Sequence, residues 1–188
     1  MFQIFFYRYF LIVSLVLLYG CSSKDDPVFA KPKQVLPIEV LYKTAYQNFT
    51  NNNYRNAIKL FEEVEKNYSY NTEWASKALL MRGYIYYESS RYIESLEILK
   101  KFKVRYAGNK NIDYVEYLIA MCIFEQIEPV AMTQENTLLA DRQFKKIIAN
   151  YPTSKYAEDS NFKLDLIQDQ LAGKEMYIAK YYTKREKW

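Results

Sequence analysis

From Ile38 onward the apolar residues recur with the spacing of α-helices, and no stretch alternates apolar and polar residues as a strand does. Three stretches share one template, in which offsets of zero, four, seven and eleven residues fall on one helical face. The first position is always small, which lets a neighbouring helix approach closely, and an aromatic or aliphatic residue follows one turn later. The pattern predicts three helices that bury this face. The template residues are Ala57, Phe61, Val64 and Tyr68, then Ser95, Leu99, Phe102 and Tyr106, then Ala140, Phe144, Ile147 and Tyr151.

A second helix is expected before each of the first two template helices. Ala45-Tyr46 lies twelve residues before Ala57, and Gly83-Tyr84 lies twelve residues before Ser95. Both pairs again place a small residue before an aromatic one. The pattern therefore predicts a repeating unit of two helices joined by a turn. The polar turns between the helices are Asn51 to Asn53 and Glu88 to Arg91.

The units repeat along the chain. Ser95 follows Ala57 by 38 residues, a little more than the roughly 34-residue period of a tetratricopeptide repeat. Ala140 follows Ser95 by 45 residues, so we expect an insertion in the third unit near Ile127 to Asn136, where Pro129 interrupts the helix. We predict an all-α fold, a tetratricopeptide-like helical-repeat array (α-solenoid). A generic helical bundle with coincidental spacing is the alternative.

The N-terminal residues carry a different signal. An apolar run from Tyr9 to Leu18 follows the cation Arg8 and leads into Leu18-Tyr19-Gly20-Cys21. The run is shorter than the roughly 20 residues that span a bilayer, and it lies where a processed leader belongs. We predict a bacterial lipoprotein signal peptide over residues 1–20 and lipid attachment at Cys21, where two acyl chains would suffice for anchoring. The alternative is an uncleaved anchor helix, or an ordinary signal peptide in which Cys21 has no role.

Residues 21–37 separate this anchor from the helical pattern. The segment contains Pro27, Pro32 and Pro37 together with lysines and few bulky residues. Such a composition is typical of an extended tether. The repeat domain is therefore expected over residues 38–188, with about three repeats and the start of a further one.

Composition excludes several classes of function. The chain has no histidine, which rules out Ser-His-Asp and Cys-His centres and histidine-ligated zinc, and its four glycines form no phosphate-binding loop. The net charge of +4, from 26 basic and 22 acidic residues, is spread along the chain and forms no stripe for nucleic acid. Cys122 lies among apolar residues, where we expect a buried, inert thiol. We expect no enzymatic activity, metal site or cofactor; an envelope enzyme with a carboxylate-only site is the alternative.

Three segments are more specific than a generic repeat: Asn111 to Tyr117, Tyr151 to Tyr156, and Leu171 to Arg185. Together with the motif ending at Cys21, they resemble the BamD family, the repeat-built lipoproteins of the outer-membrane β-barrel assembly machinery. The resemblance implies a lipid-anchored, non-enzymatic scaffold on the periplasmic face of the outer membrane, which aids the recruitment, folding and insertion of outer-membrane proteins. The implied partners are a barrel-assembly subunit of the BamA type, accessory lipoproteins and unfolded outer-membrane protein precursors. Another envelope repeat lipoprotein, such as a secretin pilotin or a cell-wall division factor, is the alternative.

The chain departs from this family in length. BamD-like proteins usually carry more repeats, whereas Trp188 falls in the turn after the first helix of a further unit. The last helix, with Tyr177, Ile178, Tyr181 and Tyr182 on one stripe, would then lack a partner helix. Either the chain is a fragment or another protein covers this end.

The first helices of the units are expected to line a concave groove. If each small residue points inward, a row of aromatic residues faces this groove, which suits an extended peptide with aromatic side chains. The resemblance implies the C-terminal strand of an unfolded outer-membrane protein as ligand, with Lys77 and Arg82 as candidate partners of its carboxylate. Each aromatic residue has the alternative role of packing between repeats. The expected groove residues are Tyr42, Tyr46, Phe49, Lys77, Leu80, Arg82, Tyr84, Tyr87, Tyr117, Met121 and Phe124.

Overall fold

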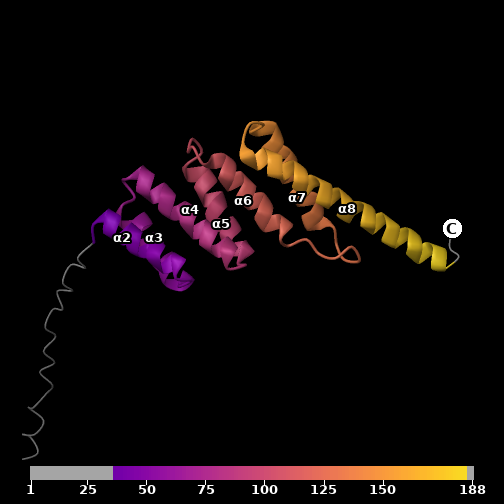
Figure 1. Cartoon of the computed structure of the whole chain (residues 1–188), viewed down its shortest axis with the longest axis horizontal. Helices are drawn as coiled ribbons and strands as arrows, with labels where there is room; N and C mark the ends of the chain where they lie inside the picture. Colours follow the sequence, from indigo (N-terminus) through magenta and orange to yellow (C-terminus); the bar gives the residue numbers. More distant parts are fainter. Residues whose placement is uncertain (1–35, 186–188) are drawn as a thin grey trace, which may run out of the picture. The chain divides into compact units, whose positions relative to one another are not determined.

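The computed structural model describes residues 36–185, which form α-helices joined by short turns, with no strand among them (Figure 1). The predicted signal peptide, Cys21 and the tether as far as Val35 lie outside the described residues, as does Trp188. The helices are α2 (Ile38–Thr50), α3 (Tyr54–Asn67), α4 (Thr72–Glu88), α5 (Tyr92–Arg105), α6 (Ile112–Phe124), α7 (Glu135–Asn150) and α8 (Lys155–Lys184).

Each helix packs against the next one in the chain. The first helices of successive hairpins also touch one another, α2 against α4, α4 against α6, and α6 against α8. Contacts confined to neighbouring units are the property that defines a repeat array. The predicted all-α, tetratricopeptide-like repeat fold is therefore confirmed.

The template positions form the core between paired helices. At the first three offsets of all three template helices, the side chains are at most 2 % exposed. The fourth position lies at the C-cap of each helix, at Tyr68 after α3, Tyr106 after α5 and Tyr151 after α7. The shared spacing thus reflects one packing arrangement used three times.

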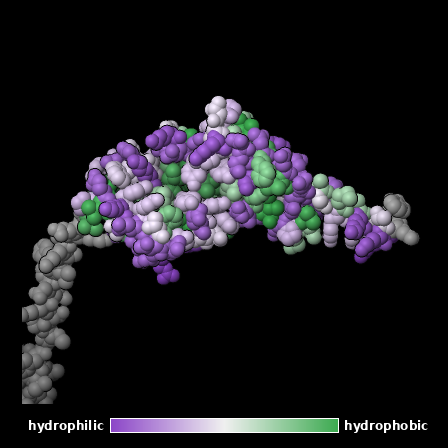
Figure 2. All heavy atoms as spheres, viewed as in Figure 1, coloured by the Kyte–Doolittle hydropathy of each residue, from purple (hydrophilic) through white to green (hydrophobic). Residues whose placement is uncertain are grey.

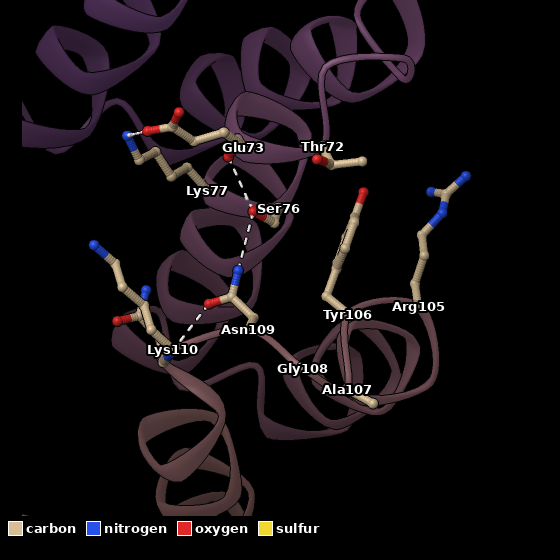
Figure 3. A pocket seen from close by; sticks show the side chains of 11 residues that line it. Thr72, Glu73, Ser76, Lys77, Arg105, Tyr106, Ala107, Gly108, Asn109 and Lys110 are labelled. Carbon is tan, nitrogen blue, oxygen red and sulfur yellow. Dashed lines mark hydrogen bonds and ion pairs between the residues drawn. The ribbon is translucent and has the colours of Figure 1, made fainter.

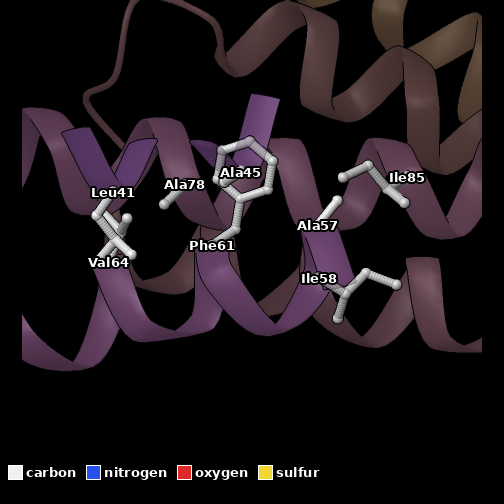
Figure 4. Packing of buried hydrophobic residues seen from close by; sticks show 8 residues of the cluster. All are labelled: Leu41, Ala45, Ala57, Ile58, Phe61, Val64, Ala78 and Ile85. Carbon is white, nitrogen blue, oxygen red and sulfur yellow. The ribbon is translucent and has the colours of Figure 1, made fainter. Parts of the chain in front are cut away.

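Small residues set the close approach of the two helices in a hairpin. Ala45 of α2 and Ala57 of α3 are fully buried around Phe61 in the first core cluster (Figure 4). In the second hairpin a Cβ atom on Gly83 would lie 2.7 Å from Cδ2 of the buried Leu99. The hydroxyl of Ser95 donates a hydrogen bond of 2.8 Å to the Gly83 carbonyl across the same contact.

The turns repeat as well. Asn52, between α2 and α3, and Ser90, between α4 and α5, both adopt a left-handed backbone, with φ of 58° and 57°. The residue after each donates its backbone N–H to a carbonyl five positions earlier, Asn53 to Asn48 and Arg91 to Tyr86. The first two hairpins therefore share a turn, 38 residues apart, in addition to a core.

The predicted insertion forms the loop between α6 and α7, residues 125–134. This loop contacts α8 through two hydrogen bonds. The Gln170 amide donates to the Glu128 carbonyl at 2.7 Å, and the Lys174 ammonium donates to the Met132 carbonyl at 2.9 Å. A Cβ atom on Gly173 would lie 3.1 Å from the loop residue Val130. The insertion thus braces the middle of the long last helix.

Helix α8 changes character along its 30 residues. Ser160 and Ile167 in its first half are buried against the preceding helices. Its second half exposes a stripe of large apolar and aromatic side chains, and hydrophobic residues are visible along it in Figure 2. Within residues 36–185, no helix combines the length and the apolar character that crossing a membrane requires. The exposed stripe consists of Met176, Tyr177, Ile178, Tyr181 and Tyr182.

Candidate functional site

A row of tyrosines crosses the first helices of the four units. We call this row the tyrosine face. Equivalent stripe positions bring the tyrosines together because α2, α4, α6 and α8 lie side by side. Tyr156 stacks on Tyr114 and Tyr117 with ring centroids 5.1 Å and 5.0 Å apart, and Tyr84 meets Phe49 edge-on at 5.8 Å. The tyrosine face consists of Tyr46 on α2, Tyr84 and Tyr87 on α4, Tyr114 and Tyr117 on α6, and Tyr156 on α8.

Carboxylates accept hydrogen bonds from the phenols of this face. The Tyr87 hydroxyl donates to Glu125 at 3.5 Å, and the Tyr117 hydroxyl donates to Asp159 at 2.5 Å. Burial, followed by a hydrogen bond to Glu88, raises the pKa of Tyr84 to about 12. Burial also raises the pKa of Tyr87 and Tyr117, with the nearby carboxylates adding to the effect. The phenols of Tyr84, Tyr87 and Tyr117 are therefore neutral hydrogen-bond donors at physiological pH.

The predicted aromatic residues divide between surface and core. Tyr46 is 48 % exposed, whereas Tyr42 packs edge-on against Phe61 and Trp74 at centroid distances of 5.1 Å and 5.0 Å. Burial accordingly raises the pKa of Tyr42. Phe49 also packs against the first core cluster and Leu80 against the second. For these half-buried residues, packing between helices is the role that the contacts show.

The third unit shows the same division. Met121 is buried, and Phe124 packs against the core residue Phe144 at 6.0 Å. The ammonium group of Lys163, on α8, lies 5.2 Å above the Phe124 ring. Tyr117 is half-buried and joins the core to the tyrosine face, because its ring contacts both Phe144 and Tyr156.

Lys77 lies at a cavity near the start of α4. The cavity, of about 520 Å³, is bounded by the first turns of α4 and by the turn between α5 and α6 (Figure 3). The Lys77 ammonium pairs with Glu73 at 2.7 Å and lies 5.0 Å from the Trp74 ring. Lys110 lies on the same side of the cavity in this view, and the Asn109 amide donates to the Ser76 hydroxyl across it at 3.3 Å.

Arg82 does not lie on the tyrosine face. Its side chain is only 10 % exposed and donates to the carboxylate of Glu65, on α3, at 2.7 Å. Lys101 and Arg105 of α5 reach the other oxygen of the same carboxylate at 2.5 Å and 3.0 Å. Lys77, Leu80 and Arg82 all lie on α4, but the Arg82 side chain points toward α3. The expectation that Arg82 binds a ligand carboxylate is therefore not retained.

Sequence reasoning missed part of the tyrosine face. Tyr114 and Tyr156 belong to the segments that carry the family resemblance, but they had no place in the expected groove. Tyr156 was not found because the expected groove comprised residues of three units only, none of them on α8. Its stacking on α6 depends on how α8 packs, which only the tertiary structure shows.

Two further predicted sites concern cysteines and metals. Cys21 lies outside the described residues. Cys122 is buried and contacts the Ser95 hydroxyl at 3.3 Å, and burial raises the pKa of its thiol to about 11. Among residues 36–185, no cluster of acidic residues and cysteine could hold a metal ion.

Comparison with known proteins identifies the family. The family model YfiO, described as outer membrane lipoprotein, matches residues 35–188. The chain belongs to this family. It is 37 % identical over 168 residues to an outer membrane protein assembly factor BamD of Caulobacter vibrioides, with 88 % of this chain and 53 % of that protein covered. The corresponding protein of Rickettsia prowazekii is 34 % identical over 176 residues, with 94 % of this chain and 68 % of that protein covered.

A protein of the same name from Neisseria gonorrhoeae is 27 % identical, with 88 % of this chain and 64 % of that protein covered. The resemblance to BamD proteins is thus confirmed over almost the entire chain. The chain spans between about half and two thirds of the length of these relatives. Membership of the YfiO family also accounts for the confirmed repeat fold.

Proposed function

We propose that this chain acts in outer-membrane protein assembly as a non-enzymatic, lipid-anchored scaffold. The observation that carries the proposal is the match to the outer membrane lipoprotein family over residues 35–188. The three relatives described above are all named outer membrane protein assembly factors, which does not favour a secretin pilotin or a cell-wall division factor. The repeat array supplies the surface, and no chemistry is required of it.

The anchor is assigned to Cys21, at the periplasmic face of the outer membrane. The assignment rests on the apolar run that precedes this cysteine and on the family description. Cys21→Ser removes the sulfur to which the lipid is attached. We expect the variant to lose labelled palmitate and to leave the membrane fraction with its helical circular dichroism unchanged. A variant that stays in the membrane without label would overturn the lipid assignment.

The tyrosine face is assigned to the capture of unfolded outer-membrane protein segments. Its phenols offer aromatic area together with hydroxyl groups that can bond an extended backbone. Tyr46 is the most favourable anchor because it is exposed and lies beside Phe49, at a centroid distance of 6.0 Å. Lys77, two turns before Tyr84 on α4, is assigned to the ligand's terminal carboxylate, with Lys110 as a second cation that lines the same cavity.

Binding of a fluorescent peptide with alternating aromatic residues and a free C-terminal phenylalanine tests this assignment. Tyr46→Ala should weaken binding about tenfold, as truncation of an anchoring aromatic residue does. Tyr70→Ala is the matched control, because Tyr70 is 78 % exposed and lies in the turn between α3 and α4, away from the tyrosine face. Neither variant should change the free energy of unfolding by more than about 0.5 kcal/mol. Equal affinities for both variants would remove the tyrosine face from the proposal.

The carboxylate assignment has its own test. The unaltered chain should prefer the peptide acid to the same peptide with a C-terminal amide. Lys77→Gln should abolish this preference while the amide still binds. If the preference is unchanged in Lys77→Gln, another cation binds the carboxylate.

The proposed protein partners are a BamA-type barrel-assembly subunit, accessory lipoproteins and unfolded precursors of outer-membrane proteins. This proposal rests on the family and on the names of its relatives. Affinity purification of the chain from detergent-solubilised envelopes should recover a β-barrel assembly subunit. Recovery of a secretin or of cell-wall synthesis enzymes instead would favour the alternative function.

A further inference from the structure

The tyrosine face is bordered by two exposed carboxylates. Glu88 is the last residue of α4 and Glu125 is the C-cap of α6, and both are exposed. Among residues 36–185, neither glutamate forms an ion pair, in contrast to the buried Glu65 and Glu116. Glu88 and Glu125 therefore leave uncompensated negative charge beside the phenols of α4.

The helix ends increase this negative charge. The C-terminal end of an α-helix carries about half a negative charge, which favours a cation in the last turn. The last turns of α2, α4, α6 and α7 contain no basic residue, and among these helices α4 and α6 end at a carboxylate. A carboxylate at such an end is unfavourable for the folded chain by itself. The arrangement becomes favourable when a ligand supplies the missing cation.

Aromatic rings complete the surroundings of this charge. Glu88 lies close enough to Tyr84 to raise the pKa of its phenol, and Glu125 accepts a hydrogen bond from the Tyr87 hydroxyl. Tyr114 lies close enough to both α4 phenols and to Glu88 for each to influence its ionisation. An ammonium or guanidinium group is attracted both to carboxylates and to the faces of tyrosine rings.

We infer that Glu88 and Glu125, with the rings of Tyr84 and Tyr87, receive a lysine or arginine side chain of the bound polypeptide. The inference rests on the proposed peptide-binding function and adds a charge preference to it. Hydrophobic and aromatic residues of the segment would contact the remaining tyrosines, and its basic residue would lie at the C-terminal ends of α4 and α6.

The structure also indicates where the basic residue falls in the peptide. Lys77 and Glu88 are eleven residues apart on α4, which corresponds to about 16 Å along the helix axis. An extended chain covers that distance in about five residues. The basic residue is therefore expected about five positions before the C-terminal residue.

Two fluorescent peptides that differ only at this position test the inference with the full chain in detergent. One carries lysine and the other carries norleucine, which has the same chain length without the charge. The unaltered chain should bind the lysine peptide about tenfold more tightly. Glu88→Gln combined with Glu125→Gln should reduce the preference to about twofold or less. Glu97→Gln combined with Glu175→Gln changes the net charge equally at exposed sites on α5 and α8, and should keep the full preference.

The outcomes separate the inference from the proposed function. Equal affinity for the two peptides, or a preference that survives Glu88→Gln with Glu125→Gln, overturns the charge preference and leaves peptide capture intact. Failure of both peptides to bind a chain with normal helical circular dichroism overturns both. Because the two glutamates oppose the helix dipoles, the double variant should melt at the same temperature as the unaltered chain or higher. Loss of binding in that variant therefore cannot be attributed to unfolding if its melting curve is intact.

Discussion

Removal of the Glu65 carboxylate should destabilise the array far more than removal of the arginine that it binds. Glu65→Gln leaves the Arg82 guanidinium, whose side chain is 10 % exposed, with Glu62 at 3.9 Å as its one acidic partner among residues 36–185. Stranding a buried charge in this way costs about 3–5 kcal/mol. Arg82→Met keeps the aliphatic volume, and Glu65 retains Lys101 and Arg105, so we expect a loss of only about 1–2 kcal/mol.

Glu116→Gln provides a matched control. Glu116 is as buried as Glu65, but its partners Lys103 and Lys146 are partly exposed, at 2.6 Å and 4.0 Å. Its substitution strands no buried cation, because both lysines can turn to solvent. We expect a loss of about 1–2 kcal/mol, well below that of Glu65→Gln.

Urea unfolding followed by far-ultraviolet circular dichroism measures all three variants. The predicted order of destabilisation is Glu65→Gln first, with Arg82→Met and Glu116→Gln clearly smaller. Equal losses for Glu65→Gln and Glu116→Gln would refute the reasoning, because burial of the carboxylate alone would then decide the cost. Arg82→Met should also bind the test peptide as the unaltered chain does, since Arg82 faces Glu65 and not the tyrosine face.

Three further predictions concern the backbone and the buried thiol. Gly83→Ala should lower the free energy of unfolding by about 1–2 kcal/mol, because the added Cβ meets buried Leu99, although alanine has the better helix propensity. An increase in melting temperature would show that Leu99 can move aside. Ser90→Val should lower the free energy of unfolding in urea by about 1–2 kcal/mol, because a β-branched residue disfavours positive φ. Ser90→Gly should cause no such loss. Equal effects of the two substitutions would contradict the strain argument. In a Cys21→Ser chain, Cys122 should react with a thiol reagent at neutral pH only when the chain is unfolded. The raised pKa of Cys122 keeps the buried thiol protonated in the folded chain. Rapid reaction of the folded chain would contradict this prediction.

The core of the array could be predicted from sequence because its determinants are local. The small residues Ala57, Ser95 and Ala140 recur with the same offsets, and a helix places fixed offsets on one face whatever its neighbours are. The insertion before Ala140 was located for the same reason, since a change of spacing marks it directly. Burial of all three positions confirms the register.

The candidate site was only partly predictable. Periodicity placed Tyr46, Tyr84 and Tyr87 on the first helices, but it could not distinguish an exposed tyrosine from a packed one such as Tyr42. That difference depends on whether a neighbouring helix covers the position. Arg82 shows most clearly what periodicity cannot predict. It was placed among the groove residues because it is close to them in sequence. Its contact with Glu65, however, depends on the packing of α3 against α4.

Helical periodicity, the small positions between paired helices and the lack of histidine are properties of the sequence alone, and they determined the fold class and excluded several kinds of catalytic centre. Tertiary packing decided which polar groups meet. It brought Glu125 to Tyr87 and Asp159 to Tyr117, pairs separated by 38 and 42 residues, and it left Glu88 and Glu125 without a cation among the described residues. Electrostatic partnership depends on distances between helices, which a one-dimensional pattern does not contain.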